Sequence, residues 1–239
     1  MFDLIVTDDR ARLTLDRPAV RNAIGLGGWD ALTVKLDEVE RSGARLLVVS
    51  GAGGAFCAGA DLSDFEHLRE GLRARAAFRV TMRRALDRLR GLPIPTIAAI
   101  DGPCFGAGVA LAMACDIRIA GIGALFAITP ALMGISYPQE DVHRLVALVG
   151  PGQAARLLFG GGSIDAAEAL RIGLVEMLGD AEPLVSAILA NDPASLDTLK
   201  RAIALAATGV RSDAAQDRAF DALFGSEALA ARLAARRKR

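Results

Sequence analysis

Two glycine-rich turns are the segments of this chain whose residue types could do chemistry. Residues 50–62 read Ser-Gly-Ala-Gly-Gly-Ala-Phe-Cys-Ala-Gly-Ala-Asp-Leu and follow the apolar run Leu46–Ser50. Residues 97–109 read Ile-Ala-Ala-Ile-Asp-Gly-Pro-Cys-Phe-Gly-Ala-Gly-Val. Turns made of such small residues leave backbone N–H groups open to a ligand. The pair predicts two backbone amides aimed at one substrate oxygen.

Three carboxylates of the chain have two interpretations each. Asp61 directly follows the first turn, where it could cap a helix that starts near Leu62 or face a substrate. Glu140 and Asp141 follow Pro138 and open a predicted helix, which first-turn acids stabilise by about 0.3–1 kcal/mol. The alternative is that one of the two acts as a catalytic acid or base.

Other chemistries have little support in the sequence. His67 and His143 lack partners at metal-ligand spacing, and no Gly-x-Ser-x-Gly motif is present, so we expect no metal site. Residues 150–155, Gly-Pro-Gly-Gln-Ala-Ala, match a dinucleotide fingerprint only weakly and suit a helix start better. We expect the cysteines to pack as small apolar groups, with a thiol role for Cys57 and Cys104 left open.

The composition bounds the partners and the compartment. The chain has 239 residues, of which 52% are hydrophobic, and its 28 Lys and Arg balance its 28 Asp and Glu. This balance predicts no nucleic-acid partner and no membrane partner. Three cysteines suit a reducing cytoplasm, and the acidic N-terminus is unlike a signal peptide. The terminal basic run Arg236–Arg239 is either a solvated helix end or a phosphate contact.

The periodicity of apolar residues predicts an α/β fold followed by helices. The expected strands are Phe2–Thr7, Ala11–Leu15, Leu46–Ser50, Thr96–Ile100, Ile117–Ala120 and Ala124–Ala127. The expected helices are Trp29–Val39, one long helix from Leu68 to about Gly91, Gly106–Ala114, Asp141–Val149, Gln153–Leu158, Asp165–Ile172, Leu184–Ala190, Pro193–Thr208, Asp213–Phe224 and Ser226–Arg239.

Four segments resemble the enoyl-CoA hydratase/isomerase, or crotonase, family. Gly53-Gly-Ala-Phe-Cys-Ala-Gly-Ala-Asp-Leu62 resembles its first oxyanion-hole segment, and residues 100–120 resemble its second. Leu15-Asp-Arg-Pro-Ala-Val-Arg-Asn-Ala23 is similar to the loop that helps to hold coenzyme A. Residues 227–237 are similar to the C-terminal helix of the family.

The resemblance implies a crotonase-like spiral of ββα units over residues 1–190 and a helical trimerisation region over residues 191–239. It implies an acyl-CoA or enoyl-CoA substrate, no permanently bound cofactor, and a homotrimer or hexamer. The thioester oxygen would lie against the N–H groups of Ala60 and Ala107. The coenzyme A part of the substrate would contact a set of residues near both loops, namely Arg21, Ala23, Ala58, Asp61 and Leu62.

The chain departs from the family at both glutamates that its hydratases use. The matching positions here are Ala110 and Pro130, and neither side chain can transfer a proton. The substitutes that we expect are Glu140, then Asp141, then Tyr137, although Tyr137 could also be a packing aromatic with its hydroxyl at solvent. The sequence therefore predicts an enzyme that forms an enolate from a CoA thioester. The alternatives are a CoA-ester decarboxylase or hydrolase, and an acyl-CoA-binding homologue with little catalysis.

Overall fold

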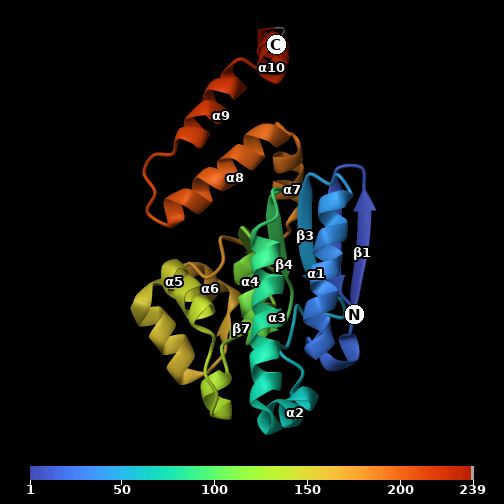
Figure 1. Cartoon of the computed structure of the whole chain (residues 1–239), viewed down its shortest axis with the longest axis vertical. Helices are drawn as coiled ribbons and strands as arrows, with labels where there is room; N and C mark the ends of the chain where they lie inside the picture. Colours follow the sequence, from blue (N-terminus) through green and yellow to red (C-terminus); the bar gives the residue numbers. More distant parts are fainter. Residues whose placement is uncertain (238–239) are drawn as a thin grey trace.

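The computed structural model describes residues 1–237, which form two sheets surrounded by helices (Figure 1). The larger sheet has the strand order β1-β2-β3-β4-β6-β9, in which β1 and β2 are antiparallel and all other neighbours are parallel. The smaller sheet has the order β5-β7-β8. The strands are β1 (Phe2–Thr7), β2 (Arg10–Leu15), β3 (Leu46–Gly51), β4 (Thr96–Ile100), β5 (Pro103–Phe105), β6 (Ile117–Ala120), β7 (Leu125–Ala127), β8 (Ile164–Asp165) and β9 (Met177–Leu178).

Helices cover both faces of the larger sheet, which explains why its central strands are continuous apolar runs. The α-helices are α1 (Leu26–Arg41), α2 (Phe65–Glu70), α3 (Leu72–Arg90), α4 (Ala107–Ala114), α5 (Gln139–Gly160), α6 (Ala166–Arg171), α7 (Glu182–Leu189), α8 (Pro193–Ala207), α9 (Ala214–Phe224) and α10 (Glu227–Arg237). Short 3₁₀ turns lie at η1 (Pro18–Val20), η2 (Leu62–Asp64) and η3 (Pro130–Met133).

Strand β3 shows how the two faces are used. Leu47 and Val49 belong to the main core, which α1 and α3 complete on one face (Figure 1). Leu46 and Val48 face a second, smaller core, where Val185 of α7 lies. Alternate residues of a strand point to opposite faces, so the side chains of residues 46–49 are all buried. The end of β3 is thereby fixed where the first glycine-rich turn begins.

The predicted α/β fold class is confirmed, with differences at particular elements. The expected long helix is broken at Gly71, whose φ of −131° and ψ of 121° are extended and separate α2 from α3. Gly150 has a non-helical φ of 75° and kinks α5. Residues 150–155 therefore lie at the junction of two helical segments and do not form a strand-to-turn fingerprint. The strands β5, β8 and β9 have only two or three residues and no periodicity signal in the sequence.

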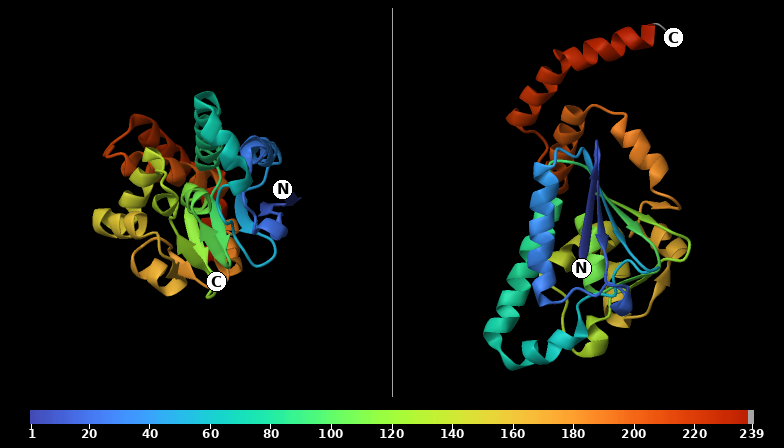
Figure 2. Two further views of the ribbon diagram at one scale, coloured as in Figure 1. Left: turned by 90° about the horizontal axis from the view of Figure 1, so that it is seen from below. Right: turned by 90° about the vertical axis from the view of Figure 1, so that its right-hand side faces the viewer.

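The C-terminal helices extend away from the rest of the molecule. Figure 2 shows α9 and α10 projecting beyond α8 and the sheet, with the C-terminus at their far end. Helix α10 ends at Arg237, and the final two residues of the predicted basic helix lie outside the described residues. The division into a core and a helical region at residue 190 stays a prediction.

Candidate active site

Backbone hydrogen bonds join the two glycine-rich turns side by side. The N–H groups of Phe56 and Cys57 both donate to the carbonyl of Pro103 at 3.0 Å, and the Phe105 N–H donates back to the Cys57 carbonyl at 2.8 Å. Gly108 packs so tightly here that a Cβ atom at this position would lie 2.4 Å from the Cys57 carbonyl oxygen. The small residues of both turns are therefore required for this close approach.

The two alanines that were predicted to act through their N–H groups lie beside each other. A Cβ atom on Gly59, the residue before Ala60, would lie 3.5 Å from the Ala107 nitrogen. Ile24 pairs with Ala60 through the N–H of Asp61 and the carbonyl of Gly59. In such parallel pairing the N–H of Ala60 itself points away from Ile24.

Neither alanine N–H has a backbone acceptor among residues 1–237 outside the regular elements. Ala107 is the first residue of α4, and the first N–H groups of a helix have no intrahelical partner. Gly106, the residue before it, offers no side chain that could cap the helix. Both turns thus present a free donor, and the positive end of the α4 dipole adds to the second.

One small cavity lies against both alanines. Its volume is about 150 Å³. Its lining is mostly apolar and comes from the two turns and the segment that leads into α5. The lining residues include Ala60, Ala107, Ala110, Pro130, Tyr137 and Asp141. Ala110 and Pro130, the positions expected to match the hydratase glutamates, therefore line the same cavity as Ala60 and Ala107.

The structure separates the three expected acid/base groups. Asp141 and Tyr137 line this cavity, whereas Glu140 is exposed and lines only a neighbouring one. By position Asp141 is therefore better placed than Glu140, and the assignment of the acid/base group stays a prediction. The packing interpretation of Tyr137 placed its hydroxyl at solvent. In the structure the hydroxyl instead donates to the Gly106 carbonyl at 2.9 Å. Burial, with the Asp141 charge nearby, raises the pKa of Tyr137 well above its usual range.

Asp141 is a fully buried carboxylate between two arginines. Its Oδ1 accepts from Arg83 Nη1 at 3.1 Å and lies 3.8 Å from Arg144 Nη1. Its Oδ2 is buried and has no hydrogen-bond partner among the described residues. Burial raises the pKa of Asp141 above its ordinary value, against the attraction of Arg83. A carboxyl group with one anchored and one free oxygen can exchange a proton with a bound molecule.

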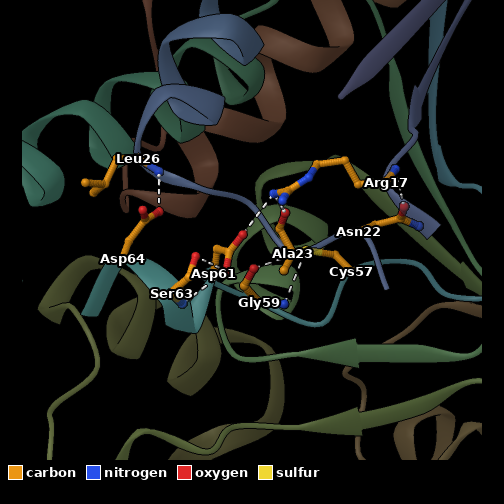
Figure 3. A network of polar contacts seen from close by, with 9 residues as sticks. All are labelled: Arg17, Asn22, Ala23, Leu26, Cys57, Gly59, Asp61, Ser63 and Asp64. Carbon is orange, nitrogen blue, oxygen red and sulfur yellow. Dashed lines mark hydrogen bonds and ion pairs between the residues drawn. The ribbon is translucent and has the colours of Figure 1, made fainter. Parts of the chain in front are cut away.

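The residues expected to contact coenzyme A gather around the first turn. The Ala58 N–H donates to the Arg21 carbonyl at 2.8 Å, and Leu62 is 62% exposed at the cavity. Figure 3 shows Arg17 Nη1 donating to both the Ala23 carbonyl, at 2.9 Å, and Asp61 Oδ2, at 3.0 Å. The loop of residues 17–23 is thereby tied to the first turn.

Asp61 also has the capping role that was its first interpretation. Its Oδ1 accepts from the N–H and hydroxyl of Ser63 at the start of η2 (Figure 3). These bonds from Ser63, together with Arg17, lower the pKa of Asp61. The carboxylate therefore stays charged at neutral pH.

Sequence reasoning missed two residues that hold this loop. Arg17 makes the contacts described above, and Asn22 is fully buried with a φ of 60°. The Asn22 Nδ2 donates to the carbonyls of Ala52 and Ala55, at 2.9 and 2.7 Å. Asparagine tolerates positive φ better than most residues, and that preference was the available signal.

The remaining candidates do not join the site. His67 and His143 are exposed on α2 and α5. Within residues 1–237 no group of His, Cys, Asp and Glu could hold a metal ion. Burial raises the pKa of Cys57 to about 12 and that of Cys104 well above its usual range, so neither is a thiolate at neutral pH.

Comparison with known proteins gives a consistent family. A model of the enoyl-CoA hydratase/isomerase family matches residues 9–226. The short-chain-enoyl-CoA hydratase of Clostridium acetobutylicum is 35% identical over 204 residues, which cover 81% of this chain and 77% of that protein. The chain belongs to the enoyl-CoA hydratase/isomerase family. It is an enzyme that acts on CoA thioesters as a lyase or an isomerase.

Solved structures agree with this assignment. The crystal structure of an enoyl-CoA hydratase/carnithine racemase from Magnetospirillum magneticum superposes with a TM-score of 0.92 at 30% identity, covering 99% of this chain and 92% of that one. An enoyl-CoA hydratase from Bacillus anthracis gives a TM-score of 0.88 at 28% identity, covering 100% and 96%. The crotonase-like fold expected from the two turns is therefore confirmed.

Proposed function

We propose that the chain binds a short acyl-CoA thioester and stabilises an enolate-type intermediate through the N–H groups of Ala60 and Ala107. The observation that carries this proposal is the pair of free backbone donors beside one apolar cavity. Formation of an enolate builds negative charge on the thioester oxygen, where fixed amides act most strongly. Loss of one such donor typically costs about 2.7–4 kcal/mol of transition-state stabilisation.

Coenzyme A is part of the substrate, and we propose that it binds beside the first turn. Arg21, Ala23, Ala58, Asp61 and Leu62 would contact it there. The bonds from Arg17 to Ala23 and Asp61 support this assignment, because they hold the loop in one conformation before the substrate arrives. A preorganised loop lowers the ordering cost of binding.

Asp141 is the group that we propose for proton transfer. Its carboxylate takes a proton from the α-carbon of the acyl group, and the electrons of that C–H bond move onto the thioester oxygen. In a β,γ-unsaturated acyl group, return of the proton to the γ-carbon moves the double bond to the α,β position, and this completes an isomerisation. The free Oδ2 and the place of Asp141 at the cavity support this role, and the exposure of Glu140 argues against the neighbouring carboxylate.

The proposal favours reactions that need one proton-carrying group over hydration by two glutamates. Ala110 and Pro130 cannot hold or activate a water molecule with their side chains. Decarboxylation or hydrolysis of a CoA ester uses the same pair of N–H groups and is the second candidate. An acyl-CoA-binding homologue with little catalysis is the third, and the two replaced glutamates are the observation that favours it.

The C-terminal helices support assembly into a homotrimer or a hexamer. Large apolar side chains are exposed there, including Ile203 at 70%, Phe220 at 60% and Phe224 at 67%. Such a surface is unusual for a monomer. The cytoplasm is the proposed compartment, and the three free cysteines of the chain support it. No helix in the described part of the chain is long and apolar enough to cross a membrane.

Deuterium exchange tests the enolate without knowledge of the overall reaction. Purified protein is incubated with butyryl-CoA in D₂O, and the mass of the acyl fragment is followed by mass spectrometry. We expect deuterium at the α-carbon. A panel of enoyl-, malonyl-type and β-keto-CoA esters then identifies the reaction. Measurable binding of butyryl-CoA without exchange, and without turnover of the panel, would refute the proposed enolate chemistry. The acyl-CoA-binding homologue with little catalysis would then be the supported function.

A further inference from the structure

The Gly106 carbonyl oxygen is an unusually well-occupied acceptor. It receives the Tyr137 hydroxyl at 2.9 Å, the Val109 N–H at 3.0 Å and the Ala110 N–H at 3.3 Å. The two backbone donors come from the first turn of α4, whereas Tyr137 lies 31 residues further along the chain. A carbonyl oxygen only accepts, so the Tyr137 hydroxyl must be the donor of its bond.

This carbonyl belongs to the same peptide group as the Ala107 N–H. The group is planar, and no cis peptide bond occurs in the described chain, so the N–H points opposite to the carbonyl. Gly106 has a φ of 49° and a ψ of −114°, a conformation that glycine adopts most readily. Glycine can also leave it easily, and rotation of this peptide would turn the Ala107 N–H out of the cavity.

We propose that Tyr137 is a positioning residue whose hydroxyl fixes the Gly106–Ala107 peptide, so that the Ala107 N–H faces the thioester oxygen. This inference rests on the proposed function, because it assigns Tyr137 to the donor that the proposed function uses. The buried ring, 9% exposed, lines the same cavity as Ala60 and Ala107. The hydroxyl bond thus ties the segment before α5 to the start of α4.

The same bond strengthens the donor as well as orienting it. A hydrogen bond to the carbonyl polarises the peptide, and chains of hydrogen bonds reinforce one another. The raised pKa of Tyr137 keeps its hydroxyl protonated through the neutral range, so that it remains a donor. This also makes Tyr137 a poor proton-transfer group, which leaves that task to Asp141.

Tyr137→Phe is the direct test, because it removes the hydroxyl and keeps the ring. Two backbone donors still hold the carbonyl, so we expect kcat for α-deuterium exchange to fall about 3- to 10-fold, the worth of one ordinary hydrogen bond, with KM nearly unchanged. Thr33→Val is the matched control, because the Thr33 hydroxyl also donates to a backbone carbonyl, that of Trp29 at 3.1 Å on α1. It should leave kcat as in the wild type.

Infrared spectroscopy gives a readout that a role in folding alone would not change. Butyryl-CoA isotope-labelled at the thioester carbonyl should show a lower stretching frequency when bound than in water. Tyr137→Phe should recover part of that shift, and Thr33→Val none of it. A bound carbonyl that shifts equally in the wild type and Tyr137→Phe would overturn the positioning role.

A double-mutant cycle separates this inference from the proposed function. Ala107→Pro removes the N–H that Tyr137 is proposed to orient, so adding Tyr137→Phe to it should have no further effect on exchange. Independent, multiplied effects of the two substitutions would contradict the inference. Absence of exchange and of any carbonyl shift in the wild type would instead refute the proposed function itself.

Discussion

The two walls of the acyl cavity are built in different ways. One wall is backbone and small residues, centred on Ala60 and Ala107, and the chemistry that we propose for it uses N–H groups that any residue but proline supplies. The other wall carries its chemistry in side chains, with Asp141 held by Arg83 of α3 and Arg144 of its own helix. The first wall is fixed by turns that are local in sequence. The second exists only when α3 and α5 pack together.

The two walls should therefore differ in the substitutions that they tolerate. A side chain can be exchanged on the backbone wall if the turn keeps its shape, because every residue except proline has a backbone N–H group. A single substitution on the other wall removes a charge from a network in which Arg83 and Arg144 lie between Asp141 and Asp87. Five predictions test this contrast.

Asp141→Asn should have the largest effect. The amide keeps the size of the side chain but cannot accept the α-proton, so exchange should fall by about 10²–10⁴. Glu140→Gln is the matched control, since it makes the same chemical change one residue earlier at an exposed position. Exchange rates measured by mass spectrometry check both. Equal losses in the two variants would count against Asp141 as the specific proton-transfer group.

Ala107→Pro should come next, with exchange lowered by about 10²–10³, because it deletes one of the two N–H donors. Proline is tolerated at the first position of a helix, which Ala107 occupies in α4. Ala107→Gly keeps the N–H and should stay near the wild-type rate. Circular dichroism and thermal melting establish that the proline variant is folded, and a folded variant with full exchange would break the backbone half of the comparison.

The pH dependence should report on the side-chain wall. Asp141 must be ionised to accept a proton, and burial raises its pKa, so the rate should rise with pH through that raised pKa and then level off. Below it the ionised fraction falls about tenfold per pH unit. Arg83, Arg144, Tyr137 and Glu140 are the charged or titratable groups that influence it.

Removal of the Arg83 charge should move the acidic limb of the pH–rate profile, which is the range where the rate rises with pH. Arg83→Gln deletes an attraction that lowers the pKa of Asp141, so the limb should shift to higher pH. Arg75→Gln, at an exposed position of α3, is the control and should leave the limb in place. A pH–rate profile that does not change with Arg83→Gln would separate Asp141 from the titrating group.

Gly108→Ala should have the smallest effect on the chemistry and a measurable one on stability. The added Cβ would lie 2.4 Å from the Cys57 carbonyl oxygen, so the two turns must move apart. Overpacking of this kind costs about 1–3 kcal/mol, or roughly 2–12 °C in melting temperature for a chain of this size. Gly152→Ala, with no atom within 4 Å of the new Cβ, is the control and should melt at or slightly above the wild-type temperature.

The same contrast explains how much could be predicted from the sequence. The turns, their free amides and the strands β1, β3 and β4 follow from runs of neighbouring residues, and these signals survive in one sequence. The ion pair of Arg83 with Asp141 joins residues 58 positions apart, and α3 carries several arginines that look alike in sequence. The bond of Tyr137 to Gly106 spans 31 positions, and the expectation of a solvent-facing hydroxyl was wrong for that reason.

The helix break at Gly71 shows the limit for local structure too. Apolar spacing continues on both sides of it, so periodicity predicted one helix where the chain forms two. A glycine inside a helical pattern costs about 1 kcal/mol relative to alanine, which makes a break possible but does not require one.

The tight surroundings of Ala110 restrict how this lineage could acquire the hydratase reaction by mutation. Ala110 is 1% exposed, and its N–H lies at the Gly106 carbonyl that Tyr137 also contacts. Ala110, Tyr137 and Asp141 line the same cavity, so a glutamate at position 110 would bring a second carboxyl into it. Under the proposed roles of Tyr137 and Asp141, a gain of this glutamate would therefore require compensating changes at those two residues.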